Sequence, residues 1–177
     1  MIDLYRDALN LSNSRVKKIS KVAFLGLPTL AVLLISSACS ISGEPMIKAS
    51  WIDPQTTESS VSVPVIDINN KKIINFAITD TDENQLTFMA YTLDDTFYVR
   101  ANVCPPCGSI GFSLDIDQLV CNTCGTVFDA KTGEGVSGGC KNFPKASVVF
   151  QNADAKLMMN ANDLQIAYQN TKKPGLP

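Results

Sequence analysis

The chain is organised around the sequence Cys104-Pro-Pro-Cys107-Gly108, which is followed by Cys121-Asn-Thr-Cys124-Gly125 and then by Cys140. Thirteen residues separate Cys107 from Cys121, and fifteen separate Cys124 from Cys140. A Cys-x-x-Cys turn places two sulfurs on one side, where both can reach the same ion. The glycine after each second cysteine can take a positive φ, which closes the turn and points backbone N–H groups at the thiolates. The pattern predicts a metal centre with four ligands, Cys104, Cys107, Cys121 and Cys124.

The residues leave three interpretations of these cysteines open. In the first, four thiolates hold a metal ion or an iron–sulfur cluster. In the second, the cysteines form disulfides, although closing two three-residue loops would remove little chain entropy. In the third, one knuckle is a dithiol redox pair, but Gly108 and Gly111 follow where such a motif usually opens a helix. The glycines favour the first interpretation.

Cys140 makes the number of cysteines in this region odd. It is a candidate fifth ligand, a replacement ligand, a neighbour of the centre or a buried free cysteine. The preceding pair Gly138-Gly139 allows its backbone to come close to the other sulfurs.

The chain has 177 residues and no histidine. This excludes c-type haem attachment through Cys-x-x-Cys-His, His-based catalytic triads and histidine-ligated zinc. No paired carboxylates, phosphate-binding loop or activated nucleophile stands out. We therefore do not expect a classical enzyme.

Residues 22–38 form an uncharged apolar run, and basic residues including Lys17, Lys18 and Lys21 precede it. Basic-then-apolar order is typical of an export signal, with the positive flank on the cytoplasmic side. Cys39 follows the small residues 36–38 and is the expected lipidation site of a lipoprotein. An uncleaved anchor and plain secretory cleavage are the alternatives, and seventeen residues is short for a span of about 30 Å. All three alternatives place the cysteines on the outer side of a membrane. Lipidation or an uncleaved anchor would also tether the protein to the extracytoplasmic face of the cell membrane.

The sequence divides into five parts. We expect a leader at 1–21, a signal or anchor segment at 22–39, a tether at 40–60, a cysteine-ligated β domain at 61–170 and a tail at 171–177. Beyond Cys39, fifteen Asp and Glu outnumber ten Lys and Arg, without a basic stripe. Nucleic acid is therefore not an expected partner.

Short apolar runs separated by turn residues dominate the chain after the tether. Runs at 61–67, 72–79, 85–91 and 96–103 are separated by residues typical of hairpin turns, such as Asp94-Asp95. A hairpin at 111–120 joins the two knuckles, and three more strands are expected at 146–151, 156–159 and 164–168. The patterns predict a mostly β fold, a small antiparallel sandwich with cysteine knuckles at one end. One N-terminal apolar helix precedes it, and no other helix is expected.

Two family resemblances rest on these cysteine elements. The run from Cys121 to Gly133 resembles the second half of a Rieske motif, with Cys124 at the position of a histidine. A wider pattern joins Val61-Ser-Val63-Pro64-Val65, Arg100-Ala101-Asn-Val-Cys104-Pro-Pro-Cys107, Val120-Cys121-Asn-Thr-Cys124-Gly125-Thr-Val-Phe128 and Gly138-Gly139-Cys140-Lys-Asn-Phe-Pro144. This pattern, over roughly residues 61–149, resembles the FtrD-like family of membrane iron–sulfur proteins found with bacterial iron-uptake systems.

The resemblance implies an iron–sulfur cluster as cofactor and Rieske-like or zinc-ribbon-like knuckles as its holder. It implies electron transfer or redox handling of iron at the membrane. A redox partner or iron-uptake membrane proteins are the implied partners. A structural zinc site in a scaffolding lipoprotein and a disulfide-held exported domain are the alternatives. If the centre is a [2Fe–2S] cluster, four thiolates in place of two histidines add negative charge and should lower the reduction potential below the Rieske range.

Overall fold

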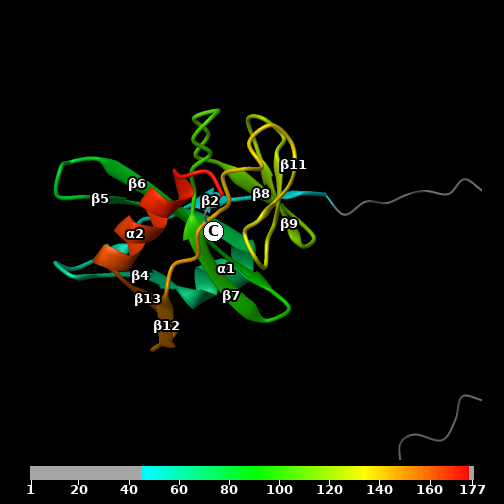
Figure 1. Ribbon diagram of the computed structural model, residues 1–177. Helices are drawn as coiled ribbons and strands as arrows, with labels where there is room; N and C mark the ends of the chain where they lie inside the picture. The colour runs from blue at the N-terminus through cyan, green and yellow to red at the C-terminus, as the bar shows by residue number, and fades with distance from the viewer. Residues whose placement is uncertain (1–44, 176–177) are drawn as a thin grey trace, which may run out of the picture. The chain divides into compact units, whose positions relative to one another are not determined.

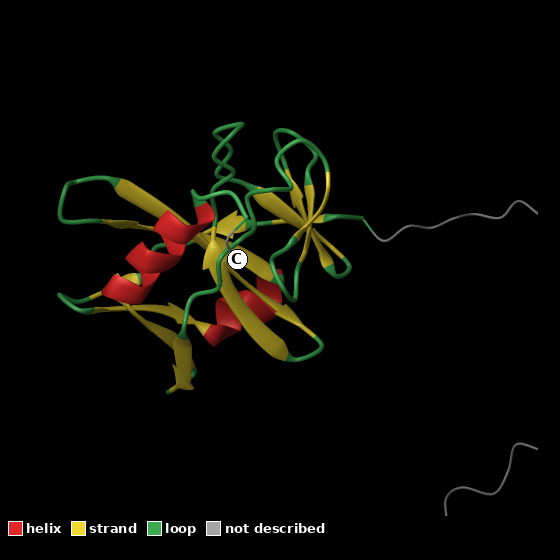
Figure 2. Cartoon of the chain, in the orientation of Figure 1, coloured by secondary structure: helices red, strands yellow, loops and turns green. Residues whose placement is uncertain are grey.

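The structure is a computed structural model that describes residues 45–175. This part of the chain forms three β-sheets and two helices (Figure 1; Figure 2). The elements are β1 (Ile47–Lys48), β2 (Ser50–Trp51), β3 (Gln55–Thr56), β4 (Ser60–Pro64), α1 (Val65–Lys71), β5 (Ile73–Thr79), β6 (Gln85–Leu93), β7 (Thr96–Ala101), β8 (Phe112–Asp115), β9 (Gln118–Cys121), β10 (Val127–Asp129), β11 (Gly135–Ser137), β12 (Phe150–Ala153), β13 (Lys156–Asn160) and α2 (Ala161–Thr171). The expected mostly β, antiparallel character is confirmed, and β2–β5 is the one parallel pair among these strands.

Each of the three sheets combines an early short strand with strands from later in the chain. The cysteine sheet has the order β1-β8-β9-β10-β11, and its strands flank both cysteine knuckles. The central sheet has the order β2-β5-β6-β7, and the outer sheet has the order β12-β13-β4-β3. Two separate hydrophobic clusters, one on each side of the central sheet, join the three sheets.

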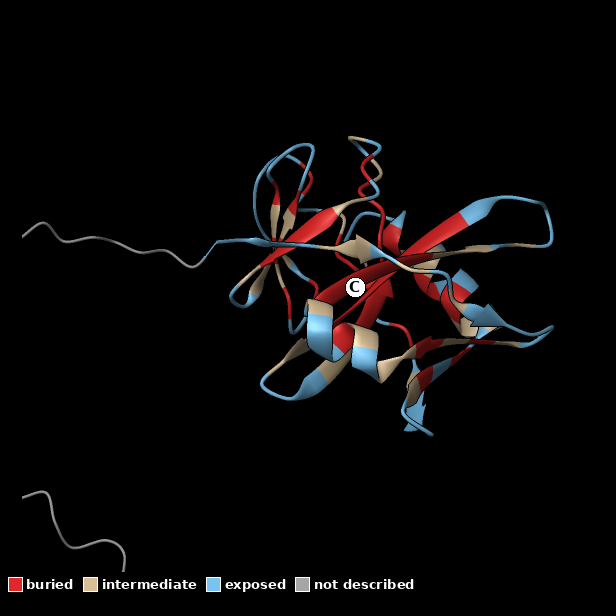
Figure 3. Ribbon diagram, turned by 180° about the vertical axis from the view of Figure 1, so that it is seen from behind, coloured by how far each residue is buried: buried red, intermediate tan, exposed pale blue. Residues whose placement is uncertain are grey.

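The central sheet is buried on both faces. Side chains alternate between faces along a strand, so neighbouring residues of β6 enter different clusters. Phe88 packs with the outer sheet and α2 in one cluster, whereas Met89 and Tyr91 pack with the cysteine sheet in the other. Figure 3 shows the long central strands buried along much of their length. The double burial explains why β5 and β6 are nearly continuous apolar runs.

A buried cation ties the central sheet to the loops around the cysteine sheet. The Arg100 guanidinium donates to the Tyr91 hydroxyl at 2.9 Å, to the Lys145 carbonyl at 2.8 Å and to the Lys131 carbonyl. Tyr91 donates in turn to the Ala130 carbonyl at 2.6 Å. Burial raises the pKa of Tyr91 to about 12, so the phenol keeps its proton for this bond at physiological pH. Three loop carbonyls therefore depend on one guanidinium and one phenol.

Tight hairpin turns set the strand registers. Asp94 and Asp95 both have positive φ values, 47° and 61°, as a two-residue type I′ turn requires between β6 and β7. At the β5–β6 turn, the Asp80 carboxylate accepts from the backbone N–H groups of Asp82 and Asn84. The expected hairpin turns are confirmed at both places.

Two helices correct the sequence-based expectations. Residues 69–71 were expected to form a turn but end α1, where Ile68 is buried and Lys71 pairs with Asp67 at 3.1 Å. Residues 164–168, expected to form a strand, belong to α2. The Asn160 side chain caps this helix by accepting from the Asn162 N–H, and Leu164, Ala167 and Thr171 are buried at helical spacing. The capping residue and the three-and-four spacing were the signals that the strand assignment overlooked.

The segment expected to be a tether contributes to the sheets. Its residues 47–56 supply one short strand to each of the three sheets, so the folded part of the chain begins before Val61. The expected apolar helix at 22–38 and the expected lipidation site Cys39 lie outside the described residues. Within residues 45–175, no helix is long and apolar enough to cross a membrane.

Replacing Arg100 by Met should lower the free energy of unfolding by about 3 kcal/mol, because three acceptors, two of them buried, lose a charged donor. Tyr91→Phe is the matched control and should cost about 1 kcal/mol, since it removes one hydroxyl from the same network. Urea denaturation of the metal-loaded protein measures both values. Equal losses for the two variants would contradict the central role assigned to the guanidinium.

Candidate metal centre

The two cysteine knuckles have equivalent backbone conformations. In the first, the Cys104 carbonyl accepts from Gly108 N–H at 2.9 Å, and Cys104 N–H donates to the Ser109 carbonyl at 2.8 Å. In the second, the Cys121 carbonyl accepts from Gly125 N–H at 2.9 Å, and Cys121 N–H donates to the Thr126 carbonyl at 2.9 Å. The same pair of bonds therefore closes each turn.

The glycines are required by backbone conformation. Gly108 and Gly125 have φ values of 71° and 68°, in the left-handed region. A Cβ at either position would meet no atom within 4 Å, so space is not the constraint. A residue with a side chain would instead be destabilised by about 1–2 kcal/mol in the left-handed conformation. This observation explains why both motifs read Cys-x-x-Cys-Gly.

The four predicted sulfurs lie together. The Sγ atoms of Cys104, Cys107, Cys121 and Cys124 are all within 4.8 Å of one another. Cys107 Sγ lies 3.8 Å from Cys121 Sγ, so the two knuckles meet directly. All five cysteines of residues 45–175 are free thiols. The group could hold a metal, and its soft sulfur ligands suit zinc and iron–sulfur centres.

Burial divides the four cysteines into an inner and an outer pair. Cys104 and Cys121, the first cysteine of each knuckle, are buried. Cys107 is half-buried and Cys124 is exposed. The inner pair belongs to the cluster that packs against the central sheet. Cys107 packs against the same cluster but keeps part of its surface exposed, and Cys124 is exposed. A centre held here would therefore have one covered side and one accessible side.

Cys140 lies beside the four-cysteine group. Its Sγ is 3.7 Å from Cys124 Sγ, and its side chain is buried. It does not belong to the set whose sulfurs are all within 4.8 Å of one another. Its N–H donates to the Thr126 hydroxyl oxygen, which also lies 3.2 Å from Cys124 Sγ. A Cβ on Gly138 would come within 2.7 Å of Thr126 Cα, so this glycine permits the close approach.

The surroundings of the cysteines shift the pKa values of three thiols in different directions. Burial raises the pKa of both Cys104 and Cys107. Partial burial also raises the pKa of Cys124, but hydrogen bonds from Thr126 and the neighbouring thiols outweigh it and lower the pKa to about 6. Cys124 should therefore ionise at lower pH than Cys104 and Cys107 in the metal-free protein.

Two neighbours of the sulfurs were not identified from the sequence. Thr126 is fully buried between Cys124 and Cys140, and Lys145 is fully buried beside the inner cysteines. Burial lowers the pKa of Lys145 to about 8, against the opposing effect of the sulfurs, chiefly Cys104. A threonine two residues after a Cys-x-x-Cys motif is a local signal that could have been used. Nothing near Lys145 in the sequence indicates its burial.

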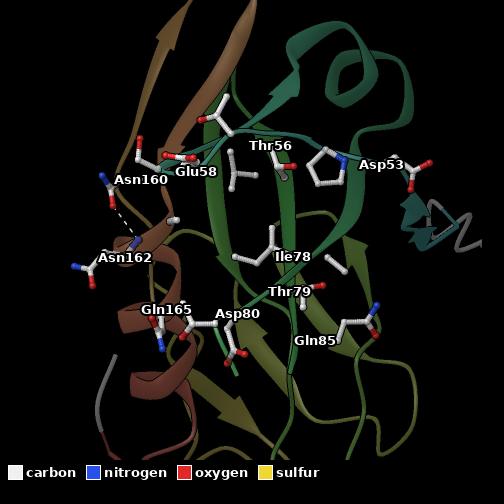
Figure 4. Close-up of a pocket in the computed structure, with 17 residues that line it drawn as sticks. Asp53, Thr56, Glu58, Ile78, Thr79, Asp80, Gln85, Asn160, Asn162 and Gln165 are labelled. Carbon is white, nitrogen blue, oxygen red and sulfur yellow. Dashed lines mark hydrogen bonds between the residues drawn. The ribbon is translucent and has the colours of Figure 1, made fainter. Parts of the chain in front are cut away.

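A separate pocket of about 740 Å³ lies on the opposite part of the fold, between the outer sheet, the β5–β6 hairpin and α2 (Figure 4). Polar side chains line most of it, including Glu58, Asp80 and Gln165. None of its lining residues is a cysteine. It is therefore distinct from the candidate metal centre.

The family comparison decides the identity of the chain. The model of the family described as "Membrane iron-sulfur containing protein FtrD-like" matches residues 68–170, which include both knuckles and Cys140. The chain belongs to this FtrD-like family. The resemblance seen in the cysteine motifs is thereby confirmed, and the four-cysteine group lies within the matched region. A search of curated proteins found no match.

Solved structures with some similarity to this FtrD-like protein include two from redox systems. One is titled "Complex of reduced oxygenase and oxidized ferredoxin in carbazole 1,9a-dioxygenase", with 20% identity and a TM-score of 0.47, covering 59% of this chain and 94% of that one. The other is the ferredoxin of Sphingomonas yanoikuyae B1, with 20% identity and a TM-score of 0.39, covering 48% of this chain and 83% of that one.

In the reduced, metal-free protein, Cys124 should be alkylated faster than Cys104 and Cys107, with a half-maximal rate near pH 6. The reason is that Cys124 is exposed and has a pKa of about 6, whereas burial raises the pKa of Cys104 and Cys107. Iodoacetamide labelling at a series of pH values, followed by peptide mass spectrometry, measures the rates. Cys124→Ser is the control. First labelling at Cys107 would contradict the assignment of inner and outer thiols.

Proposed function

We propose that Cys104, Cys107, Cys121 and Cys124 hold the iron–sulfur centre of this family member, which serves in electron transfer or redox handling of iron at the membrane. The observation that supports this most strongly is that four sulfurs from two equivalent knuckles meet within the region matched by the iron–sulfur family. When bound, such a centre stores and releases single electrons. The protein supplies the thiolates, excludes water from the inner pair and leaves the outer pair accessible to a partner.

The outer pair is the side on which we expect electrons to enter and leave. Cys124 is exposed and Cys107 is half-buried, whereas the inner pair is covered by apolar side chains of the cysteine sheet. A redox partner must therefore approach the knuckle tips. The partner is another membrane or membrane-associated redox protein in this proposal, and iron-uptake proteins are the candidate class.

The proposed membrane attachment is taken from the sequence-based expectation. The family is a membrane family. We propose that residues 22–39 tether the β domain to the extracytoplasmic face, with lipidation at Cys39. Mass spectrometry of the N-terminal peptide from membranes tests this, because an acylated Cys39 would begin the mature chain. Recovery of an intact leader peptide would support the uncleaved anchor instead.

Tetrathiolate zinc is a second candidate for the centre, in a protein that binds or scaffolds at the membrane. Zinc bound to four cysteines with bonds of about 2.3 Å has sulfur–sulfur edges of about 3.8 Å. The Cys107–Cys121 distance of 3.8 Å matches this edge, and the 4.8 Å limit for all pairs suits a small centre. A two-iron cluster needs a wider separation between sulfurs on different irons.

The full chain, purified anaerobically from membranes, should contain iron and acid-labile sulfide and absorb visible light. Cys104→Ser should lose the absorption and at least half of the metal, because it removes an inner ligand that links metal binding to folding. Cys140→Ser is the matched control and should retain both, since Cys140 lies outside the group of four. Stoichiometric zinc without colour would establish the second candidate, and unchanged metal in Cys104→Ser would refute the ligand assignment.

Replacing Thr126 by Val should lower the midpoint potential of the centre. The Cys124 thiol donates to the Thr126 hydroxyl oxygen at 3.2 Å, and once the thiol loses its proton on binding metal, the hydroxyl can donate to the thiolate in return. A hydrogen bond to sulfur stabilises the more negative, reduced state. The expected effect is roughly tenfold in the reduced-to-oxidised ratio, the size of one charge-assisted bond. Thr123→Val, at an exposed position of the same knuckle, is the control and should leave the potential unchanged. Voltammetry measures both, and equal shifts would argue against the hydrogen bond.

A further inference from the structure

Lys145 is held rigidly within the protein. Its side chain has no exposed surface. Its N–H donates to the Gly133 carbonyl at 2.8 Å, and its own carbonyl accepts from Arg100. Its ammonium lies 4.4 Å from the centroid of the Phe128 ring and 5.3 Å from that of Phe112. The backbone and the stem of this lysine are therefore fixed on every side.

The ammonium of Lys145 lacks a carboxylate partner. Its Nζ donates to the Val103 carbonyl at 2.8 Å. The ion pairs found in residues 45–175 are Lys71–Asp67 and Lys131–Asp94, and neither involves Lys145. Burying a charge without a counter-ion is unfavourable because the charge loses its hydration, and aromatic faces and one carbonyl offset only part of this loss. A compensating negative charge must therefore come from another group.

The cysteine sulfurs can supply this negative charge, because they lie in the same buried region of the fold. Val103, which accepts the ammonium's hydrogen bond, is directly followed by Cys104. Phe112 and Phe128, on which the ammonium rests, belong to the same buried cluster as Cys104, Cys121 and Cys140. Four thiolates around a divalent ion or a [2Fe–2S] core leave net negative charge at the centre. Lys145 lies on the covered side of that charge, where solvent does not screen it.

We propose that Lys145 is the built-in counter-ion of the cysteine centre, which offsets the thiolate charge from the buried side and raises the reduction potential. The proposal rests on the function proposed above. Reduction adds a further negative charge, so a fixed cation stabilises the reduced centre more than the oxidised one. All-thiolate ligation lowers the potential, and the lysine partly reverses that effect. In this role Lys145 is a positioning and charge-setting residue and does not bind the metal.

A purely structural lysine would give the opposite result. If Lys145 only filled space and bridged to Val103, its removal would loosen the packing and admit water to the inner cysteines. Water stabilises the more highly charged reduced state, so the potential would then rise. The direction in which the reduction potential changes when Lys145 is replaced therefore distinguishes a counter-ion from a purely structural lysine.

The test compares Lys145→Met with Lys141→Met in the full chain. Lys141 follows Cys140 and is exposed, so its removal takes the same charge from the same region of the fold under solvent screening. Redox titration followed by visible absorption should show a fall of at least tenfold in the reduced-to-oxidised ratio for Lys145→Met, which is about 59 mV for one electron. Lys141→Met should shift the ratio less than threefold. An equal shift in both variants, or a rise in Lys145→Met, would overturn the proposal.

A second measurement applies if Lys145→Met does not accumulate with its centre. Zinc-loaded wild-type protein labelled with ¹⁵N-lysine should show one ammonium signal protected from solvent exchange and coupled to the Val103 carbonyl. A neutral amine at this position, or no protected signal, would refute the counter-ion. Failure of the proposed function looks different, because wild-type protein purified from membranes would then lack iron and visible absorption.

Discussion

Four sulfur atoms from two separate loops lie within 4.8 Å of one another, and the rest of the structure depends on keeping them there. Each knuckle is closed by the same pair of backbone hydrogen bonds around its first cysteine. Two short turns cannot fix their own separation, so the cysteine sheet and the central sheet must do it. The cluster that contains Cys104 and Cys121 also contains Met89 and Tyr91 of β6, and this packing holds the knuckles together.

The two buried cations near the cysteine group, Arg100 and Lys145, make different kinds of contact. Arg100 donates hydrogen bonds to loop carbonyls and to Tyr91. These bonds hold the loop around residues 130–133 and the segment at Lys145 against the central sheet. The Lys145 ammonium makes a single hydrogen bond, to the Val103 carbonyl, and lies over two aromatic rings. A guanidinium with a planar array of donors suits a structural clamp, whereas a compact ammonium suits a point charge.

Local patterns were sufficient for most of the strands and for the metal-binding motif. The alternation in β4 and the turn at Asp94-Asp95 are set by neighbouring residues, so they could be predicted. Local signals for helix α2 were also present, namely the Asn160 cap and the helical spacing of its buried residues, and the strand assignment overlooked them. The short strands β1–β3 could not be predicted locally, since two residues show no period and are stabilised by the sheets they join.

The sequence by itself determined the four candidate ligands, the need for glycine after each knuckle and the absence of histidine from the site. These properties depend on residue type and close spacing, which backbone geometry translates directly into structure. Only the tertiary structure decided which sulfurs are covered, that Cys140 lies beside Cys124, and that Thr126 and Lys145 approach the centre. Lys145 lies more than forty positions from Cys104 in the chain, and burial and electric fields depend on distance in space, which local sequence does not record.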